Sequence, residues 1–337
     1  MASTIKDVAK MADVSISTVS RVINDSKPVS PEAKRRVLHA IEVLDYRPNE
    51  VARSLVTKKS NIIGVIVDDI GSAYASKVLR GVEEVGRMYN YDILLSSSYG
   101  DPEIELKFAK LFAQKQVEGI ILISAVLNQK LMYKLEESRI PYININRFYD
   151  IEENLTVRID YEKASYDMTK YLIEQGHENI AAVVIQKDID RTEEKYKLNG
   201  YKKAMKEEKL QDNIVYTMGI KENDIEEIFE KIDETINSGI TALFCSQDEI
   251  AIHIINHLVD KGLKVPQDVS VTGFGGTDLM DIYRPRLTTA KISYYDIGAV
   301  AIRRILKRIE NKEVIDEERI SLPVQILKRD SVKSLKK

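Results

Sequence analysis

The residues best suited to contact a ligand directly lie near the N-terminus, in the segment TIKDVAKMADVSISTVSRVIN at residues 4–24. Small hydroxyl and amide side chains recur there, together with one guanidinium. The members of this set are Thr4, Ser15, Ser17, Thr18, Ser20, Arg21 and Asn24, with Ile5 beside Thr4. Hydroxyl and amide groups suit phosphate oxygens and base edges, and a guanidinium matches the two acceptors of a guanine. We therefore expect these residues to bind DNA; the alternative is an ordinary capped helical hairpin.

Local signals predict the two helices that would position these side chains. Thr4 and Asp7 have the spacing of a capping box, which predicts that a first helix begins at Ile5. Ser15 is a suitable N-cap for a second helix over Ile16–Ile23. When so tight a turn joins two helices, the N-terminal residues of the second can enter a major groove.

A third helix and a local excess of positive charge complete this N-terminal head. Ser30-Pro31-Glu32 combines an N-cap, a proline in the first turn and an acid facing the helix dipole. It predicts a helix from Pro31 to about Leu44 that closes a three-helix core. Residues 1–60 hold 11 Lys and Arg against 7 Asp and Glu, a net charge of +4, whereas the remainder has a net charge of −7. This asymmetry places a polyanion site at the N-terminus.

Three ordered motifs in this region resemble the LacI family of bacterial transcriptional regulators. They are T-I-K-D-V-A at 4–9, V-S-x-S-T-V-S-R-V-I-N at 14–24 and Y-R-P-N-x-V-A-R-x-L at 46–55. The resemblance implies a hinge helix that enters the minor groove, with contacts from Asn49, Ala52 and Leu55. It also implies that Leu55 wedges into the central base step.

Beyond residue 60, strands and helices alternate in the pattern of parallel βαβ units. The predicted fold class is α/β: a helix-turn-helix head and hinge helix, followed by two lobes of doubly wound parallel sheets. Two such lobes resemble the periplasmic sugar-binding fold that the LacI family carries. We predict a head at 1–48, a hinge helix and linker at 49–60, a first lobe at 61–160 with about 291–320, and a second lobe at 161–290 with about 321–330.

An effector cleft is expected between the lobes, at the carboxyl ends of the parallel strands. The candidate lining residues are Tyr74, Asp160, Lys197, Asp248, Gly275 and Asp278. Two positions depart from the family pattern: Lys197 replaces the usual arginine of R-x-x-G-[FY], and Gly275 replaces the aspartate of G-F-D. We therefore expect no cofactor and a mostly vestigial pocket; the alternative is a phosphorylated sugar as effector, because lysine can still bind a phosphate.

Four further motifs resemble the catabolite-control branch of the LacI family. They are M-Y-x-Y at 88–91, K-L-x-G-Y at 197–201, D-E-x-A at 248–251 and Y-D-I-G-A-V-A at 295–301. That branch is regulated by a protein partner, the phosphocarrier HPr phosphorylated on a regulatory serine. The expected contact residues are Tyr89, Tyr295, Asp296, Ala299, Val300, Arg303 and Arg304.

Helical spacing supports part of this set, because Asp296, Ala299, Val300 and Arg303 fall at i, i+3, i+4 and i+7. An apolar centre flanked by a carboxylate and a guanidinium suits a partner helix that carries a phosphoserine. Alternatively, Ala299 and Val300 face the core and Arg303 is solvated. Arg304 departs from the family, which has an apolar residue there.

The expected function is that of a regulator of carbon catabolite genes, which binds a pseudo-palindromic operator as a homodimer. Serine-phosphorylated HPr would raise its affinity for DNA. A sugar-inducible repressor of one operon is the nearer alternative, and a solute-binding or sugar-processing protein is the more distant one.

Other chemistries have little support in the sequence. The four histidines lack a paired nucleophile, and Cys245 lies in an apolar strand, so we expect neither an enzyme nor a metal site. His253 and His257 have i, i+4 spacing, but two ordinary helix histidines are the better interpretation. There is no secretory core and no run of 18 apolar residues, which predicts a cytoplasmic protein without a membrane partner.

Overall fold

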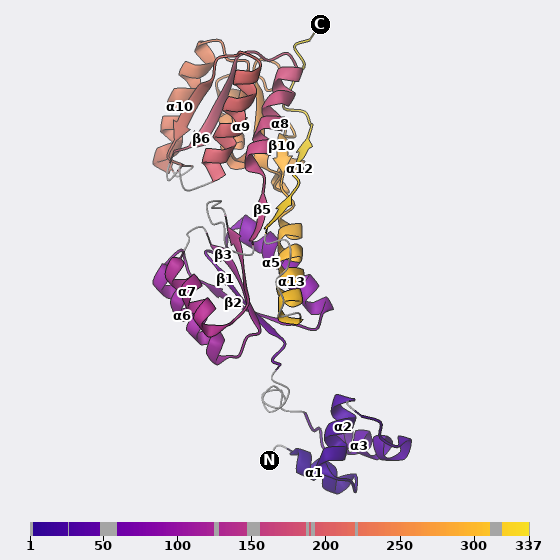
Figure 1. The fold of residues 1–337 in the computed structure, drawn as a ribbon. Coiled ribbons are helices and arrows are strands. Elements are labelled where there is room, and N and C mark those ends of the chain that lie inside the picture. The colour runs from indigo at the N-terminus through magenta and orange to yellow at the C-terminus, as the bar shows by residue number, and fades with distance from the viewer. Residues whose placement is uncertain are drawn as a thin grey trace. The chain divides into compact units, whose positions relative to one another are not determined.

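In the computed structural model, the chain forms two compact units, Met1–Ser60 and Asn61–Lys337, which we call the head and the core (Figure 1). The structure describes residues 3–25, 27–47, 59–124, 128–146, 156–186, 189, 193–219, 222–310 and 319–336. Among these residues, no helix has both the length and the apolar character needed to cross a membrane.

The head contains three helices: α1 (Ile5–Met11), α2 (Ile16–Asn24) and α3 (Pro31–Val43). Each begins at the residue predicted from the sequence. Ser30 caps α3 by accepting a hydrogen bond from the Ala33 backbone, and Pro31 follows in the first turn. Val8, Val19 and Val37 are fully buried between the helices and form the centre of this small core.

The first lobe of the core is built on a six-stranded parallel sheet in the order β11-β5-β4-β3-β1-β2. Its strands are β1 (Ile62–Val67), β2 (Asp92–Ser97), β3 (Gly119–Ser124), β4 (Tyr142–Asn146), β5 (Thr156–Ile159) and β11 (Arg319–Leu322). Helices α6 (Pro102–Gln114) and α7 (Gln129–Ser138) lie on one side of the sheet, and α5 (Ala73–Met88) and α13 (Tyr294–Glu310) on the other (Figure 1).

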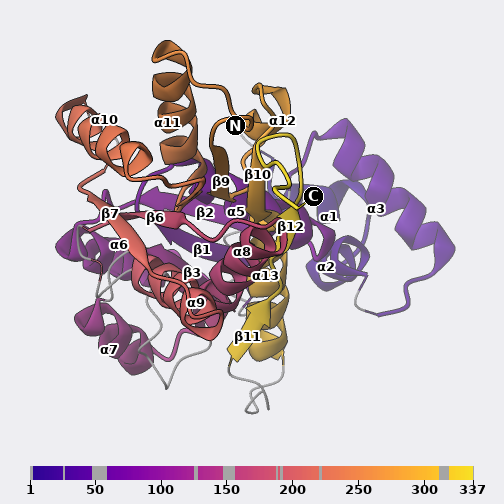
Figure 2. The same cartoon turned by 90° about the horizontal axis from the view of Figure 1, so that it is seen from above.

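The second lobe has a six-stranded sheet in the order β12-β10-β9-β8-β6-β7, in which only the β10–β12 pair is antiparallel. Its strands are β6 (Ile180–Ile185), β7 (Asn213–Thr217), β8 (Ala242–Cys245), β9 (Ser270–Gly275), β10 (Thr288–Lys291) and β12 (Gln325–Leu327). Its helices are α8 (Tyr161–Glu174), α9 (Glu193–Glu207), α10 (Glu222–Asn237), α11 (Asp248–Asp260) and the short α12 (Leu279–Ile282). Figure 2 shows α10 and α11 on one side of the strands, and α8 and α9 on the other.

Three short connections join the two sheets. The chain passes from β5 to α8, from β10 to α13, and from β11 to β12. As a result α13, although it follows a strand of the second lobe, packs on α5, β3 and β4 of the first lobe. The predicted fold class, two doubly wound lobes behind a helix-turn-helix head, is confirmed.

Candidate DNA-binding surface and regulatory sites

The N-terminus of α2 presents a cluster of hydroxyl groups. Ser15 caps the helix by accepting a hydrogen bond from the Thr18 backbone at 3.2 Å. The Ser15 hydroxyl also lies 2.8 Å from that of Ser17 and 2.9 Å from that of Thr18. Ser17 and Arg21 are exposed, while Thr18 and Ser20 are half-buried. Helix α2 therefore carries hydroxyl donors at its N-terminus and an exposed guanidinium in its last turn, the groups that suit phosphates and base edges.

The other predicted DNA contacts in the head have local structural roles as well. Asp7 accepts hydrogen bonds from the Thr4 backbone and hydroxyl at 2.8 and 2.7 Å, which lower the pKa of Asp7. Asn24 is exposed and donates to the Ser20 carbonyl at 2.9 Å. Ile5 is half-buried and packs against the core of the head, so only part of its side chain faces outward. Asn49, Ala52 and Leu55 lie outside the described residues.

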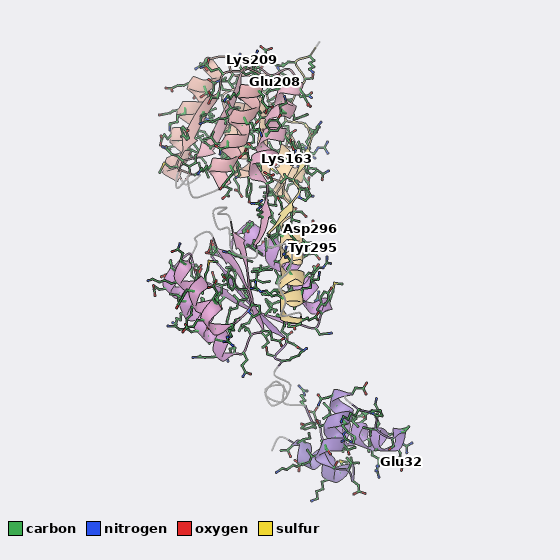
Figure 3. The ribbon with its side chains drawn as sticks, viewed as in Figure 1. Glu32, Lys163, Glu208, Lys209, Tyr295 and Asp296 are labelled. Carbon is green, nitrogen blue, oxygen red and sulfur yellow. The ribbon has the colours of Figure 1, made fainter. Side chains whose placement is uncertain are left out.

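Helices α5 and α13 approach each other closely because a glycine on each leaves room for the other backbone. A Cβ atom at Gly81 would lie 2.1 Å from the Tyr295 carbonyl oxygen, and one at Gly298 would lie 2.0 Å from the Val78 carbonyl oxygen. No residue with a side chain could replace either glycine unless the backbone of the opposite helix moved. The two helices thus form a single continuous surface, with Tyr295 and Asp296 at the N-terminal end of α13 (Figure 3).

This surface, which we call the α5–α13 face, includes residues that sequence reasoning missed. The Glu84 carboxylate accepts a hydrogen bond from Arg80 Nε at 2.8 Å, and it is also hydrogen-bonded to the Tyr295 hydroxyl. These two bonds lower the pKa of Glu84, and the bond to Glu84 raises the pKa of Tyr295. The i, i+4 spacing of Arg80 and Glu84 signals their mutual pairing but not their link to α13.

The structure corrects the predicted partner contact in two places. Ala299 is only 6% exposed because it packs where Gly81 brings α5 close. Arg304 is also only 6% exposed, so its guanidinium cannot join a surface contact with a partner. Asp296 and Arg303 are exposed and Val300 is half-buried, which leaves a narrower stripe than predicted. Tyr89 is 53% exposed at the C-terminus of α5.

A cavity of about 320 Å³ lies between the two lobes. Its aromatic walls include Tyr74 of α5 and Tyr294 of α13, whose rings meet edge to face with centroids 5.1 Å apart. Of the residues predicted to line the cleft, Tyr74, Lys197, Asp248 and Gly275 do so. Further lining residues include Lys77, Tyr161 and Phe274.

Lys197, which would bind the phosphate of a phosphorylated effector, already has partners in the structure. Its ammonium donates to Glu194 at 2.8 Å and to the Ser246 carbonyl at 2.9 Å. It also lies 4.9 Å from the centre of the Phe274 ring, and the residue is 3% exposed. The charge of Lys197 is therefore balanced by groups of the second lobe. Its ammonium is poorly available to bind a phosphate.

Asp248 also has hydrogen-bond partners within the protein. Its carboxylate accepts hydrogen bonds from the Thr289 hydroxyl at 2.5 Å and from the Thr277 backbone at 2.9 Å. Burial raises the pKa of Asp248, although these bonds oppose the shift. Gly273 leaves the space that the carboxylate occupies, because a Cβ atom at Gly273 would lie 2.5 Å from Asp248 Oδ1.

Two predicted cleft residues lie elsewhere. Asp160 caps α8 through the Lys163 backbone at 2.9 Å, and it lines a different cavity beside α8 and α9. The reason is that Asp160 lies in the connection from β5 to α8, where its carboxylate caps the helix and does not face the cavity between the lobes. The Asp278 side chain does not line the cavity. It is 88% exposed and pairs with Lys77, which does line it.

Comparisons with known proteins agree with this architecture. Residues 4–49 match the model of bacterial regulatory proteins of the lacI family, and residues 169–332 match a periplasmic binding protein-like domain. The chain is 37% identical over 340 residues to catabolite control protein A of Priestia megaterium, covering 98% of this chain and 99% of that protein.

The chain belongs to the LacI family.

Two further proteins are similar to this chain over its full length. The ribose operon repressor of Halalkalibacterium halodurans is 34% identical over 332 residues, covering 98% of this chain and 97% of that protein. The crystal structure of the lac repressor dimer bound to operator and the anti-inducer ONPF has a similar fold, with a TM-score of 0.84 at 23% identity. It covers 99% of this chain and 100% of the lac repressor chain.

Family membership makes this chain a DNA-binding transcriptional regulator and not an enzyme. Cys245 is fully buried, and burial raises the pKa of its thiol well above the ordinary range. His257 lies 2.8 Å from Asp233 and stacks on Phe229. Within the described residues, no group of three or more His, Cys, Asp or Glu side chains is placed to hold a metal ion.

Proposed function

We propose that this chain is a cytoplasmic regulator of carbon catabolite genes, which binds a pseudo-palindromic operator as a homodimer. Its affinity for the operator is raised by an HPr-type phosphocarrier phosphorylated on serine. The full-length similarity to catabolite control protein A supports the class of regulated genes. The exposed hydroxyls and Arg21 on α2 support the reading of DNA in the major groove.

The observation that carries the co-repressor proposal is the composition of the α5–α13 face. Arg303 and Asp296 are exposed on α13 with Val300 between them, and Arg80 of α5 is held beside Tyr295 by Glu84. A phosphoserine on a partner helix would accept charge-assisted hydrogen bonds from Arg303, while the apolar part of its helix packs on Val300. Asp296 would then repel partners that present an acid at its own end of the face.

In this mechanism the folding of a hinge helix over Asn49–Val56 would depend on DNA. A helix of so few residues is marginal in water, so its stability depends on the operator and on the spacing between the two cores of the dimer. The co-repressor would favour the lobe orientation in which two hinge helices pair, with Leu55 of each in the central base step.

Titration calorimetry with purified serine-phosphorylated HPr tests the co-repressor site directly. We expect Arg303→Asp to weaken binding at least tenfold, because a phosphate contact is replaced by charge repulsion. Arg308→Asp is the matched control, since it makes the same charge change at an exposed position of α13 outside the stripe. Equal binding by the two variants would refute the assignment of the α5–α13 face.

A sugar-inducible repressor of a single operon is the second candidate. The cavity between the lobes supports it, because aromatic walls and about 320 Å³ of space suit a neutral sugar. Micromolar binding of a free sugar that releases the operator would favour this function over co-repression by a phosphocarrier.

A further inference from the structure

One ion pair connects the two lobes directly at the edge of the cavity. The ammonium of Lys77, on α5 of the first lobe, lies 2.9 Å from the Asp278 carboxylate, which follows β9 of the second lobe. The Lys77 side chain is 30% exposed and that of Asp278 is 88% exposed. Lys77 also lines the cavity, so the pair lies where the lobes would separate.

The second lobe holds Asp278 firmly. It follows two glycines, Gly275 and Gly276, with φ of +132° and +69°, a region that favours glycine. A Cβ atom at Gly276 would lie 2.7 Å from the Lys291 Cα, so the loop runs directly against β10. The Thr277 backbone donates to the buried Asp248 carboxylate at 2.9 Å. Asp278 must therefore move together with the second lobe.

On the first lobe, Lys77 begins a row of charged residues that leads to the α5–α13 face. Lys77, Arg80 and Glu84 follow one another at i, i+3 and i+7, on one side of α5. Arg80 donates to Glu84, and Glu84 is bonded to Tyr295 at the start of α13. Asp278 thus pairs with the first residue of this row and also acts electrostatically on Arg80, whose contacts with Glu84 and Tyr295 belong to the surface proposed to bind the co-repressor.

We propose that the Lys77–Asp278 pair is a latch between the lobes, which fixes their relative orientation and thereby sets the affinity of the α5–α13 face for its partner. The latch rests on the geometry of the core alone, and its effect on the partner rests on the proposed function. An exposed ion pair is weak, so it would favour the latched orientation by only about two- to fivefold. A preference of this size can be reversed by a single ligand, as regulation requires.

Charge reversal and charge exchange test the latch. Spin labels at Lys107→Cys on α6 and Asp260→Cys on α11 would report the distance between the lobes, since both positions are exposed and the native Cys245 is buried. We expect Lys77→Asp to broaden the distance distribution and the exchange Lys77→Asp with Asp278→Lys to restore it. Arg87→Asp is the control, because it breaks an exposed ion pair with Glu83 that lies within α5.

An unchanged distribution in Lys77→Asp would overturn the latch, as would failure of the charge exchange to restore it. Calorimetry with serine-phosphorylated HPr gives the second readout: Lys77→Asp should weaken binding about two- to fivefold, and the exchange should recover it. Altered distances with unchanged affinity would overturn the coupling to the partner. If the unmodified chain does not bind phosphorylated HPr, the proposed function fails, while the distance measurement still decides whether the latch exists.

Discussion

The close packing of α5 on α13 gives a sharp prediction for Gly81→Ala. The added Cβ atom would meet the Tyr295 carbonyl oxygen at 2.1 Å and the Ala299 nitrogen at 2.9 Å. Both are backbone atoms of a helix, so they cannot rotate away, and α13 must shift by about 1 Å to restore ordinary contact distances. Overpacking of this kind costs about 1–3 kcal/mol, and we expect the upper half of that range here. The better helix propensity of alanine offsets about 1 kcal/mol, which leaves a net loss of about 1–2 kcal/mol.

Gly86→Ala is the matched control, because it makes the same substitution in the same helix. Its nearest neighbour would be Ile93 Cδ1 at 3.3 Å, the flexible end of a side chain. We expect Gly86→Ala to be neutral or to stabilise the chain by about 0.5–1 kcal/mol through helix propensity alone. Urea unfolding of the full-length variants, followed by circular dichroism, gives the comparison. If Gly81→Ala were as stable as Gly86→Ala, the described packing of α5 on α13 would be wrong.

Three further predictions concern the head, the second lobe and the hinge. Ser15→Ala removes the cap of α2 and should destabilise the head by about 1 kcal/mol in thermal unfolding, whereas Ser17→Ala, which caps nothing, should have little effect. Burial lowers the pKa of His177 below its ordinary 6.5. Just below pH 6.5, His177 is therefore protonated in the unfolded chain and neutral in the folded chain. The free energy of unfolding should therefore fall as the pH drops below about 6.5. His177→Gln should weaken this pH dependence, and an identical pH profile for the variant would exclude His177 as its source. Leu55→Ala should weaken binding to the operator far more than binding to random DNA, and equal losses on both would rule out a wedge in the base step.

The order of helices and strands could be predicted because several of the helices begin at a strong local signal. Ser30-Pro31 starts α3, and Asp101-Pro102 starts α6 by the same combination of cap and proline. Buried strands such as β1 stand out as short apolar runs between polar turns. Each of these signals involves only a few neighbouring residues, so it can be recognised in a single sequence.

The sites were harder to predict because their geometry depends on contacts between distant segments. Periodicity placed Asp296, Ala299 and Arg303 on one side of α13, but only the approach of Gly81 buries Ala299. Likewise, the sequence shows Lys197 in place of an arginine, yet not that Glu194 and the Ser246 carbonyl already bind its ammonium. An apolar pattern defines a helix face, whereas glycine contacts and buried ion pairs decide what that face can bind.

We propose that a phosphorylated protein raises the affinity of this chain for an operator. Fluorescence anisotropy tests it most directly, with a labelled pseudo-palindromic duplex carrying a central CG step at fixed salt. The chain would be titrated alone, with unmodified HPr, with serine-phosphorylated HPr, and with a panel of sugars and sugar phosphates. Tighter binding with phosphorylated HPr, and not with unmodified HPr, is the predicted result. Release of the operator by one sugar, with no response to either form of HPr, would contradict it.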